Sequence, residues 1–200
     1  GDRPARGMNA APAPARSFDW EAYGRAVMAG EVAICKWTRL AVARHYQDMQ
    51  VGHLRGLRFS EEHAQHALET FLFFRHSKGE WAGRPFDLSP WQQFWVALAF
   101  GWLREDGSRR FREVWMEVPR KNGKSTMLSG IGLYLFEFDG EGGAEVYTAA
   151  TKMDQAKITH AEAVRMVEAS PLLRRHIGIR LNELFNPRPG RADKFTPLAR

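Results

Sequence analysis

Residues 119–126 combine glycine, basic and hydroxyl side chains in the order that a phosphate-binding loop needs. The segment reads Pro119-Arg120-Lys121-Asn122-Gly123-Lys124-Ser125-Thr126. Phosphate groups are held by backbone N–H groups at a helix N-terminus and by a mobile ammonium group. Gly123 would let the backbone approach the phosphates, and Lys124 would reach the β- and γ-phosphates. The hydroxyl of Ser125 would ligate Mg²⁺, so the loop predicts an enzyme that uses ATP and Mg²⁺.

The segments on either side of this loop fit the same interpretation. In residues 112–118, apolar side chains occupy alternate positions, which predicts a strand. Residues 127–138 are apolar nearly all round, which predicts a helix buried against a sheet, and Thr126 would add a second hydroxyl to its first turn. The general pattern G-x-x-x-x-G-K-[ST] has its first glycine where this chain has Val118. A chance Gly-Lys-Ser-Thr at a helix start is therefore the alternative interpretation.

Four segments, in order along the chain, resemble the large terminase subunits of tailed bacteriophages, which pump DNA into empty capsids. The first, Leu88-Ser89-Pro90-Trp91-Gln92-Gln93-Phe94, resembles a family segment whose glutamine is taken to read adenine. The second is the loop itself, which resembles the deviant phosphate loop of that family. The third and fourth, residues 149–156 and 194–199, resemble the next strand-to-helix junction and the strand that leads toward the acidic motif. Together they cover roughly residues 60–200.

The resemblance implies an α/β fold with a P-loop NTPase-type sheet core and an N-terminal helical region. We expect a disordered lead-in over residues 1–16, a helical region with the adenine-side segment over 17–110, and the start of the ATPase core over 111–200. The acidic strand that orients Mg²⁺ and activates water, and the C-terminal nuclease domain, would lie beyond residue 200. On this interpretation the sheet core is incomplete in this chain.

The function implied is that of an ATP-hydrolysing motor that moves double-stranded DNA into the procapsid. The partners implied are DNA without sequence preference, the portal protein and the small terminase subunit, with the subunits forming a ring in the host cytoplasm. One alternative is another P-loop enzyme, such as a helicase-like ATPase or a small-molecule kinase. A second is a nucleic-acid-binding module whose phosphate loop is vestigial, which the missing first glycine leaves open.

Two pairs of residues near the loop have both a functional and a structural interpretation. Gln92 follows Ser89 by three positions, which is the spacing of a capping box, whereas the resemblance implies contact with adenine. Trp91 could stack on the base or belong to the core. Arg120 could stabilise charge on the γ-phosphate during hydrolysis, or it could share a solvated loop with Lys121.

Other polar residues are weaker candidates. Thr151, Lys152 and Gln155 follow a predicted strand at 144–149 and could relay the nucleotide state, or Thr151 could simply cap the helix predicted over 153–169. His63 and His66 share a helix face, but no further ligands follow at metal-site spacing, so we expect a structural role. The late chain is basic and could contact DNA phosphates or form a solvated face. Its basic residues are Arg174, Arg175, Arg180, Arg188, Arg191 and Lys194.

Composition sets broader limits. The 44% hydrophobic content is that of a globular chain. The net charge of +6 favours polyanionic partners. Cys35 is the single cysteine, so an intrachain disulfide is excluded. The longest apolar runs are shorter than the ~20 residues that a membrane span needs. Helices are predicted over 18–29, 31–48, 60–75 and 89–104, and one or two short strands over 178–200.

Overall fold

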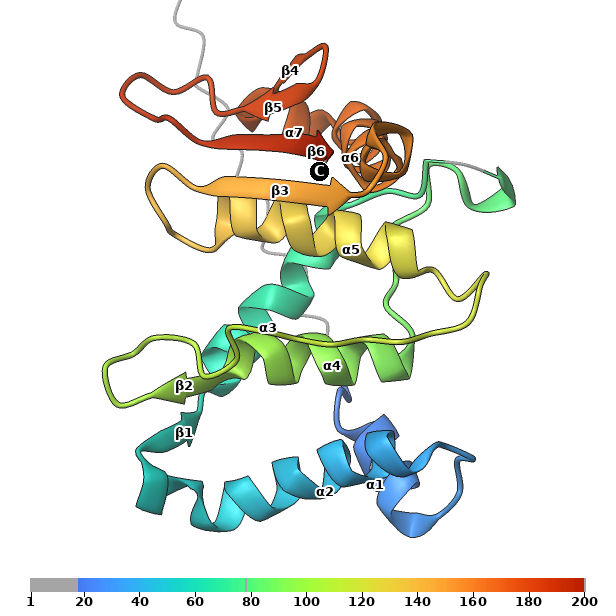
Figure 1. Cartoon of the computed structure of the whole chain (residues 1–200), viewed down its shortest axis with the longest axis vertical. Coiled ribbons are helices and arrows are strands. Elements are labelled where there is room, and N and C mark those ends of the chain that lie inside the picture. The colour runs from blue at the N-terminus through green and yellow to red at the C-terminus, as the bar shows by residue number, and fades with distance from the viewer. Residues whose placement is uncertain (1–17, 78, 200) are drawn as a thin grey trace, which may run out of the picture.

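The structure is a computed structural model that describes residues 18–77 and 79–199. The lead-in predicted over residues 1–16 lies outside the described residues. Figure 1 shows two regions: helices from the first half of the chain form one end, and a small sheet with its covering helices forms the other. This arrangement confirms the α/β fold class and the N-terminal helical region.

The N-terminal region is built from four α-helices and a short pair of antiparallel strands. The helices are α1 (Ala22–Ala29), α2 (Lys36–Val51), α3 (Glu61–Thr70) and α4 (Pro90–Gly101). The strands β1 (Leu57–Phe59) and β2 (Trp102–Arg104) pair in antiparallel register, with Phe59 opposite Trp102. Short 3-10 turns are η1 (Gly52–Arg55), η2 (Phe71–Phe73) and η3 (Gly79–Trp81). All four predicted helices form, although their ends differ by several residues.

Local capping signals explain where two of these helices begin. The hydroxyl of Ser60 accepts a hydrogen bond from the N–H of His63, which satisfies one free donor of α3. At α4, Ser89 precedes Pro90, and proline suits the first helical position because its missing N–H is not needed there. Side chains from α3 and α4 then bury an aromatic core that includes Phe71 and Phe94.

The C-terminal region is a four-stranded mixed sheet covered on one face by helices. Its strands are β3 (Glu145–Ala150), β4 (Gly178–Arg180), β5 (Glu183–Phe185) and β6 (Lys194–Ala199), in the order β3-β6-β5-β4. Only β3 and β6 run parallel. The helices are α5 (Lys124–Leu133), which continues as the π-helix η4 (Tyr134–Phe138), followed by α6 (Met153–Ala169) and α7 (Pro171–His176).

The sheet and its helices meet at closely packed positions. Phe195 of β6 is fully buried, and its ring lies 2.8 Å from the point where a Cβ on Gly132 of α5 would stand. The hydroxyl oxygen of Ser129 lies 2.7 Å from Ser125 O in the same helix and 2.8 Å from Thr159 O of α6, so its single proton is shared between the two carbonyl groups. These contacts hold α5 and α6 side by side and fix the start of α5 relative to the sheet.

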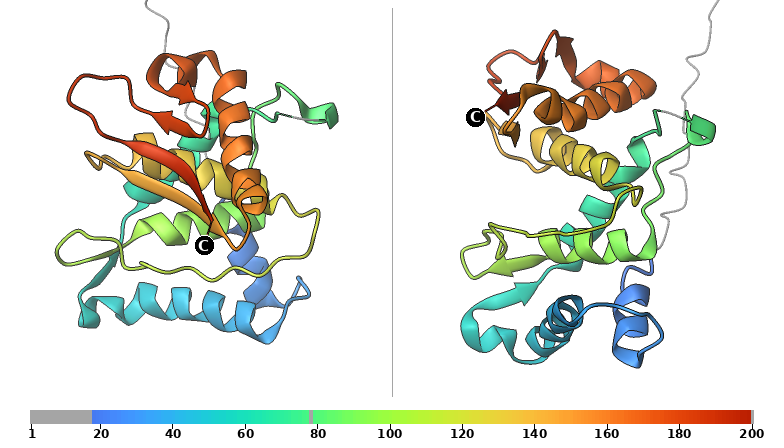
Figure 2. Two further views of the ribbon diagram at one scale, coloured as in Figure 1. Left: turned by 45° about the horizontal axis from the view of Figure 1, so that its top comes forward. Right: turned by 45° about the vertical axis from the view of Figure 1, so that its right-hand side comes forward.

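The predicted strand over residues 112–118 does not form. Residues 113–119 lie in no sheet, and Val114 and Trp115 are 60% and 93% exposed. Figures 1 and 2 show α5 between this segment and the four-stranded sheet. Since a strand needs a neighbour to complete its backbone hydrogen bonds, the alternating pattern alone does not produce one here. The helix predicted over 127–138 does form, but it begins at Lys124 and ends as a π-helix.

Candidate nucleotide-binding site

Helix α5 begins directly after a left-handed glycine. Gly123 has φ 69° and ψ 13°, and no side chain caps the helix. The N–H of Met127 donates to Gly123 O at 2.9 Å, so the N–H groups of Lys124, Ser125 and Thr126 precede the first helical hydrogen bond. The first turn contains no acidic residue that would neutralise the helix dipole. The start of α5 therefore presents N–H donors and a positive partial charge to an anion.

The loop before α5 is held in an unusual conformation. Lys121 has φ 68°, a value that costs a non-glycine residue ~1–2 kcal/mol. The side-chain amide of Asn122 donates to the carbonyl oxygens of Pro119 and Arg120, each at 3.3 Å. These bonds direct the two carbonyl groups toward Asn122 and stabilise the strained turn. Backbone strain of this kind clusters at ligand-binding sites.

Three cationic residues lie in the loop and at the first position of the helix. Arg120, Lys121 and Lys124 are all exposed, and none forms an ion pair with any residue in the described ranges. Ser125 and Thr126 are half-buried. Phosphate oxygens would meet charge-assisted donors from these side chains, which are the stronger class of hydrogen bond. The loop therefore combines backbone donors, cations and hydroxyl groups at one point on the surface.

The structure brings Gln92 of α4 to this loop. Gln92 is 5% exposed, and its Oε1 accepts hydrogen bonds from the N–H and the hydroxyl of Ser89 at 2.9 and 3.0 Å. The capping box is thus present. Its Nε2 lies 3.3 Å from the point where a Cβ on Gly123 would stand. The same amide closes the start of α4 and lies beside the loop before α5.

Trp91 has a different environment. Its half-buried side chain lines a cavity of about 790 Å³ between α2, α4 and the segment 113–118. No residue of the loop 119–126 lines that cavity. The lining ends with Glu117 and Val118, directly before the loop, and the stacking of Trp91 on a base stays a prediction.

Thr151, Lys152 and Gln155 are exposed where β3 leads into α6. The arrowheads of β3 and β6 point to the side of the molecule on which α5 begins (right in Figure 1). The N-cap of α6 is Lys152, which makes no side-chain cap hydrogen bond, so the alternative in which Thr151 caps the helix is wrong. Thr151 lies one residue too early, and its side chain is left without a capping role.

Most of the late basic residues form ion pairs with nearby carboxylates. Arg180 pairs with Glu183, Arg188 with Glu137, Arg191 with Asp193 and Lys194 with Glu145. Within the described ranges, Arg174 and Arg175 are exposed on α7 without an ion pair. A solvated, internally paired face therefore describes four of the six residues.

The two histidines of α3 have structural partners. His63 Nδ1 lies 2.8 Å from the hydroxyl of Ser60, and His66 Nδ1 lies 3.2 Å from the hydroxyl of Tyr134. Among the residues that the structure describes, no group of three or more His, Cys, Asp or Glu side chains is placed to hold a metal ion. None of the described helices combines the length and hydropathy needed to cross a lipid bilayer.

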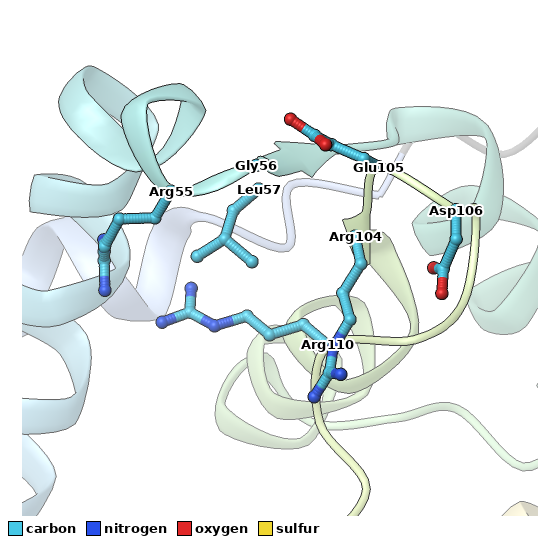
Figure 3. Close-up of a pocket in the computed structure, with 7 residues that line it drawn as sticks. All are labelled: Arg55, Gly56, Leu57, Arg104, Glu105, Asp106 and Arg110. Carbon is cyan, nitrogen blue, oxygen red and sulfur yellow. The ribbon is translucent and has the colours of Figure 1, made fainter.

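Figure 3 shows another cavity, of about 580 Å³, which is lined by charged side chains and which the sequence did not indicate. Arg55, Arg104 and Arg110 line it from three separate segments. The buried carboxylate of Asp48 pairs with Arg55 and, at 2.6 Å, with Arg110, so two of the three charges are neutralised. The cavity lies at the β1–β2 end of α4, away from the loop (Figure 1). We assign this cluster to the folding of the N-terminal region.

Comparison with known proteins gives matches of two kinds. A family model described as "Terminase large subunit, ATPase domain" matches residues 90–184. Among solved structures, the chain is similar to the large terminase of the HK97 bacteriophage, with a TM-score of 0.55 and 19% sequence identity. That match covers 68% of this chain and 27% of the terminase, so the chain spans about a quarter of its length. No curated protein matches.

The family match includes Gln92, the whole phosphate loop and the junction between β3 and α6. The structural match, at this level of identity, bears on the fold. Both agree with the resemblance stated from four short segments of the sequence. Residues 90–184 match the ATPase domain of terminase large subunits, and the fold of the chain is similar to that of a large terminase.

Proposed function

We propose that this chain binds Mg²⁺-ATP through residues 119–126 and contributes to ATP hydrolysis in a DNA-packaging motor. The observation that carries the proposal is the uncapped start of α5, which follows a left-handed Gly123 and lies next to three exposed cations that form no ion pair within the described ranges. A helix N-terminus of this kind favours phosphate because its free N–H groups and its dipole both attract negative charge.

Each loop residue has a distinct proposed role. Lys124 places its ammonium group beside the β- and γ-phosphates, and Ser125 supplies a hydroxyl ligand for Mg²⁺. Arg120 stabilises the charge that spreads over the γ-phosphate oxygens during phosphoryl transfer. Lys121 adds a cation, and Thr126 a hydroxyl in the first turn. Asn122 acts on the loop backbone, since its amide holds the carbonyl groups of Pro119 and Arg120.

The larger function that we propose is translocation of double-stranded DNA into the procapsid, in the host cytoplasm. The motor would act as a ring of subunits with the portal protein and the small terminase subunit, and a nuclease domain would cut the DNA. The family match of residues 90–184 supports this proposal. Arg174 and Arg175 are the late basic residues left for DNA phosphates, and such contacts weaken steeply as salt concentration rises.

Displacement of a fluorescent ATP analogue tests the nucleotide part of the proposal. We expect ATP and inorganic tripolyphosphate to displace the analogue, and adenosine to do so far less, because the loop contacts are to phosphate. If neither ATP nor tripolyphosphate binds at millimolar concentration, the nucleotide part of the proposal is refuted, and the result favours the binding module with a vestigial loop. If the affinity of the protein for duplex DNA does not change with salt concentration, the proposed contacts with DNA phosphates are contradicted.

A further inference from the structure

The acceptor side of the Gln92 amide is already used within the protein. Oε1 has two lone pairs, and it accepts hydrogen bonds from both the N–H and the hydroxyl of Ser89. The side chain is buried in the first turn of α4, where these bonds close the helix start. Reading the edge of adenine requires one donor and one acceptor from the same amide. Gln92 has only its donor side left for another partner.

That donor side faces the phosphate loop. Apart from the residues next to Gly123, Nε2 of Gln92 is the only described atom within 4 Å of the point where a Cβ on Gly123 would stand. The separation of 3.3 Å is close contact for that position. Gly123 needs its left-handed conformation in order to turn the chain into α5. The Gln92 amide therefore lies beside the residue that sets the direction of the helix donors, at the place where a side chain on that residue would stand.

We propose that Gln92 is a positioning residue for the phosphate loop, which supports Gly123 and the triphosphate site rather than reading the base. This inference rests on the proposed nucleotide-binding function. Through one amide, the start of α4 is coupled to the start of α5. Replacing Gln92 should therefore change the affinities for ATP, GTP and tripolyphosphate by the same factor, because all three present the same phosphates to the loop.

The test compares the affinities of the wild-type protein, Gln92→Glu and Gln92→Ala for ATP, GTP and tripolyphosphate. Gln92→Glu keeps the acceptor oxygen for Ser89, so the melting temperature should stay within a few degrees of wild type. It replaces the donor with a carboxylate beside the loop, and all three ligands should weaken by a common factor of about tenfold or more. Gln92→Ala removes the amide without adding charge and should weaken all three by a smaller common factor.

Gln93→Glu is the matched control. Gln93 is the next residue of the same turn, and its Nε2 donates to Leu88 O at 2.6 Å, outside the loop. The same change of charge should alter the three affinities by less than about threefold. A loss confined to ATP in the Gln92 variants would identify a base reader and overturn the inference. Unchanged affinity for all three ligands would also overturn it. A wild-type protein that binds none of them would instead refute the proposed function, and this inference with it.

Discussion

Replacing Gly123 with alanine isolates the left-handed turn from which α5 begins. At φ 69°, a side chain with a Cβ costs ~1–2 kcal/mol. The new methyl group would also stand 3.3 Å from Gln92 Nε2, so the amide must move by a few tenths of an ångström. For a domain of this size, that cost lowers the melting temperature by roughly 2–8 °C. Because the N–H donors of α5 are aimed by this turn, triphosphate affinity should fall by about tenfold or more.

Gly30 provides the matched control for this experiment. It ends α1 at φ 80°, and apart from its two chain neighbours no atom of the described residues lies within 4 Å of the point where its Cβ would stand. Gly30→Ala should therefore lower the melting temperature by a similar amount through backbone strain alone, and leave triphosphate affinity unchanged. Thermal unfolding and calorimetric titration with tripolyphosphate measure both quantities. If Gly123→Ala binds tripolyphosphate as tightly as Gly30→Ala does, the turn at Gly123 does not position the phosphate donors and the reasoning is wrong.

Three further changes test the packing of the N-terminal region and of α5. Burial lowers the pKa of His45 to about 4, so below pH 6.5 the unfolded chain binds a proton at this residue that the folded chain does not bind. The contribution of His45 to the free energy of unfolding should therefore fall by up to about 3 kcal/mol between pH 6.5 and 4 and be constant above pH 7. Urea unfolding of His45→Gln should lack most of this pH dependence, and an identical pH dependence would refute the assignment. Ser129→Ala should cost about 1 kcal/mol in urea unfolding, because it removes the hydroxyl that links α5 to Thr159 O of α6; no loss would contradict that link. Gly130→Ala should lower the free energy of unfolding by about 1–3 kcal/mol, because the new Cβ would stand 2.5 Å from the Phe71 ring. An unchanged free energy of unfolding would show that α5 and the η2 turn can move apart.

Elements with local signals were predictable from the sequence. The helix predicted over 153–169 has the bounds of α6, because Ser170-Pro171 ends it and the preceding pattern is regular. The start of α4 at Ser89-Pro90 is equally local. The strand over 112–118 was not predictable, because pairing depends on which other segment lies beside it. Here the neighbour is helix α5, and the alternating side chains do not form a ladder.

The candidate site shows the same division. The composition of residues 119–126 indicated a phosphate loop, and the structure places their charges at the start of α5. The sequence offers the capping box and the ligand role of Gln92 as alternatives, whereas the structure shows one amide that caps α4 and also lies beside Gly123. The ion pairs of Asp48 with Arg55 and Arg110 join distant parts of the chain, and no spacing in the sequence indicates them.

Calorimetric titration of tripolyphosphate into Lys124→Ala, beside wild type, is the most direct test of phosphate binding at the start of α5. Lys157 is an exposed lysine of α6 outside the loop, and Lys157→Ala is the control for loss of one positive charge. We expect wild type and Lys157→Ala to bind with equal affinity and Lys124→Ala to bind about tenfold more weakly or worse. Equal affinity for all three proteins would contradict the account.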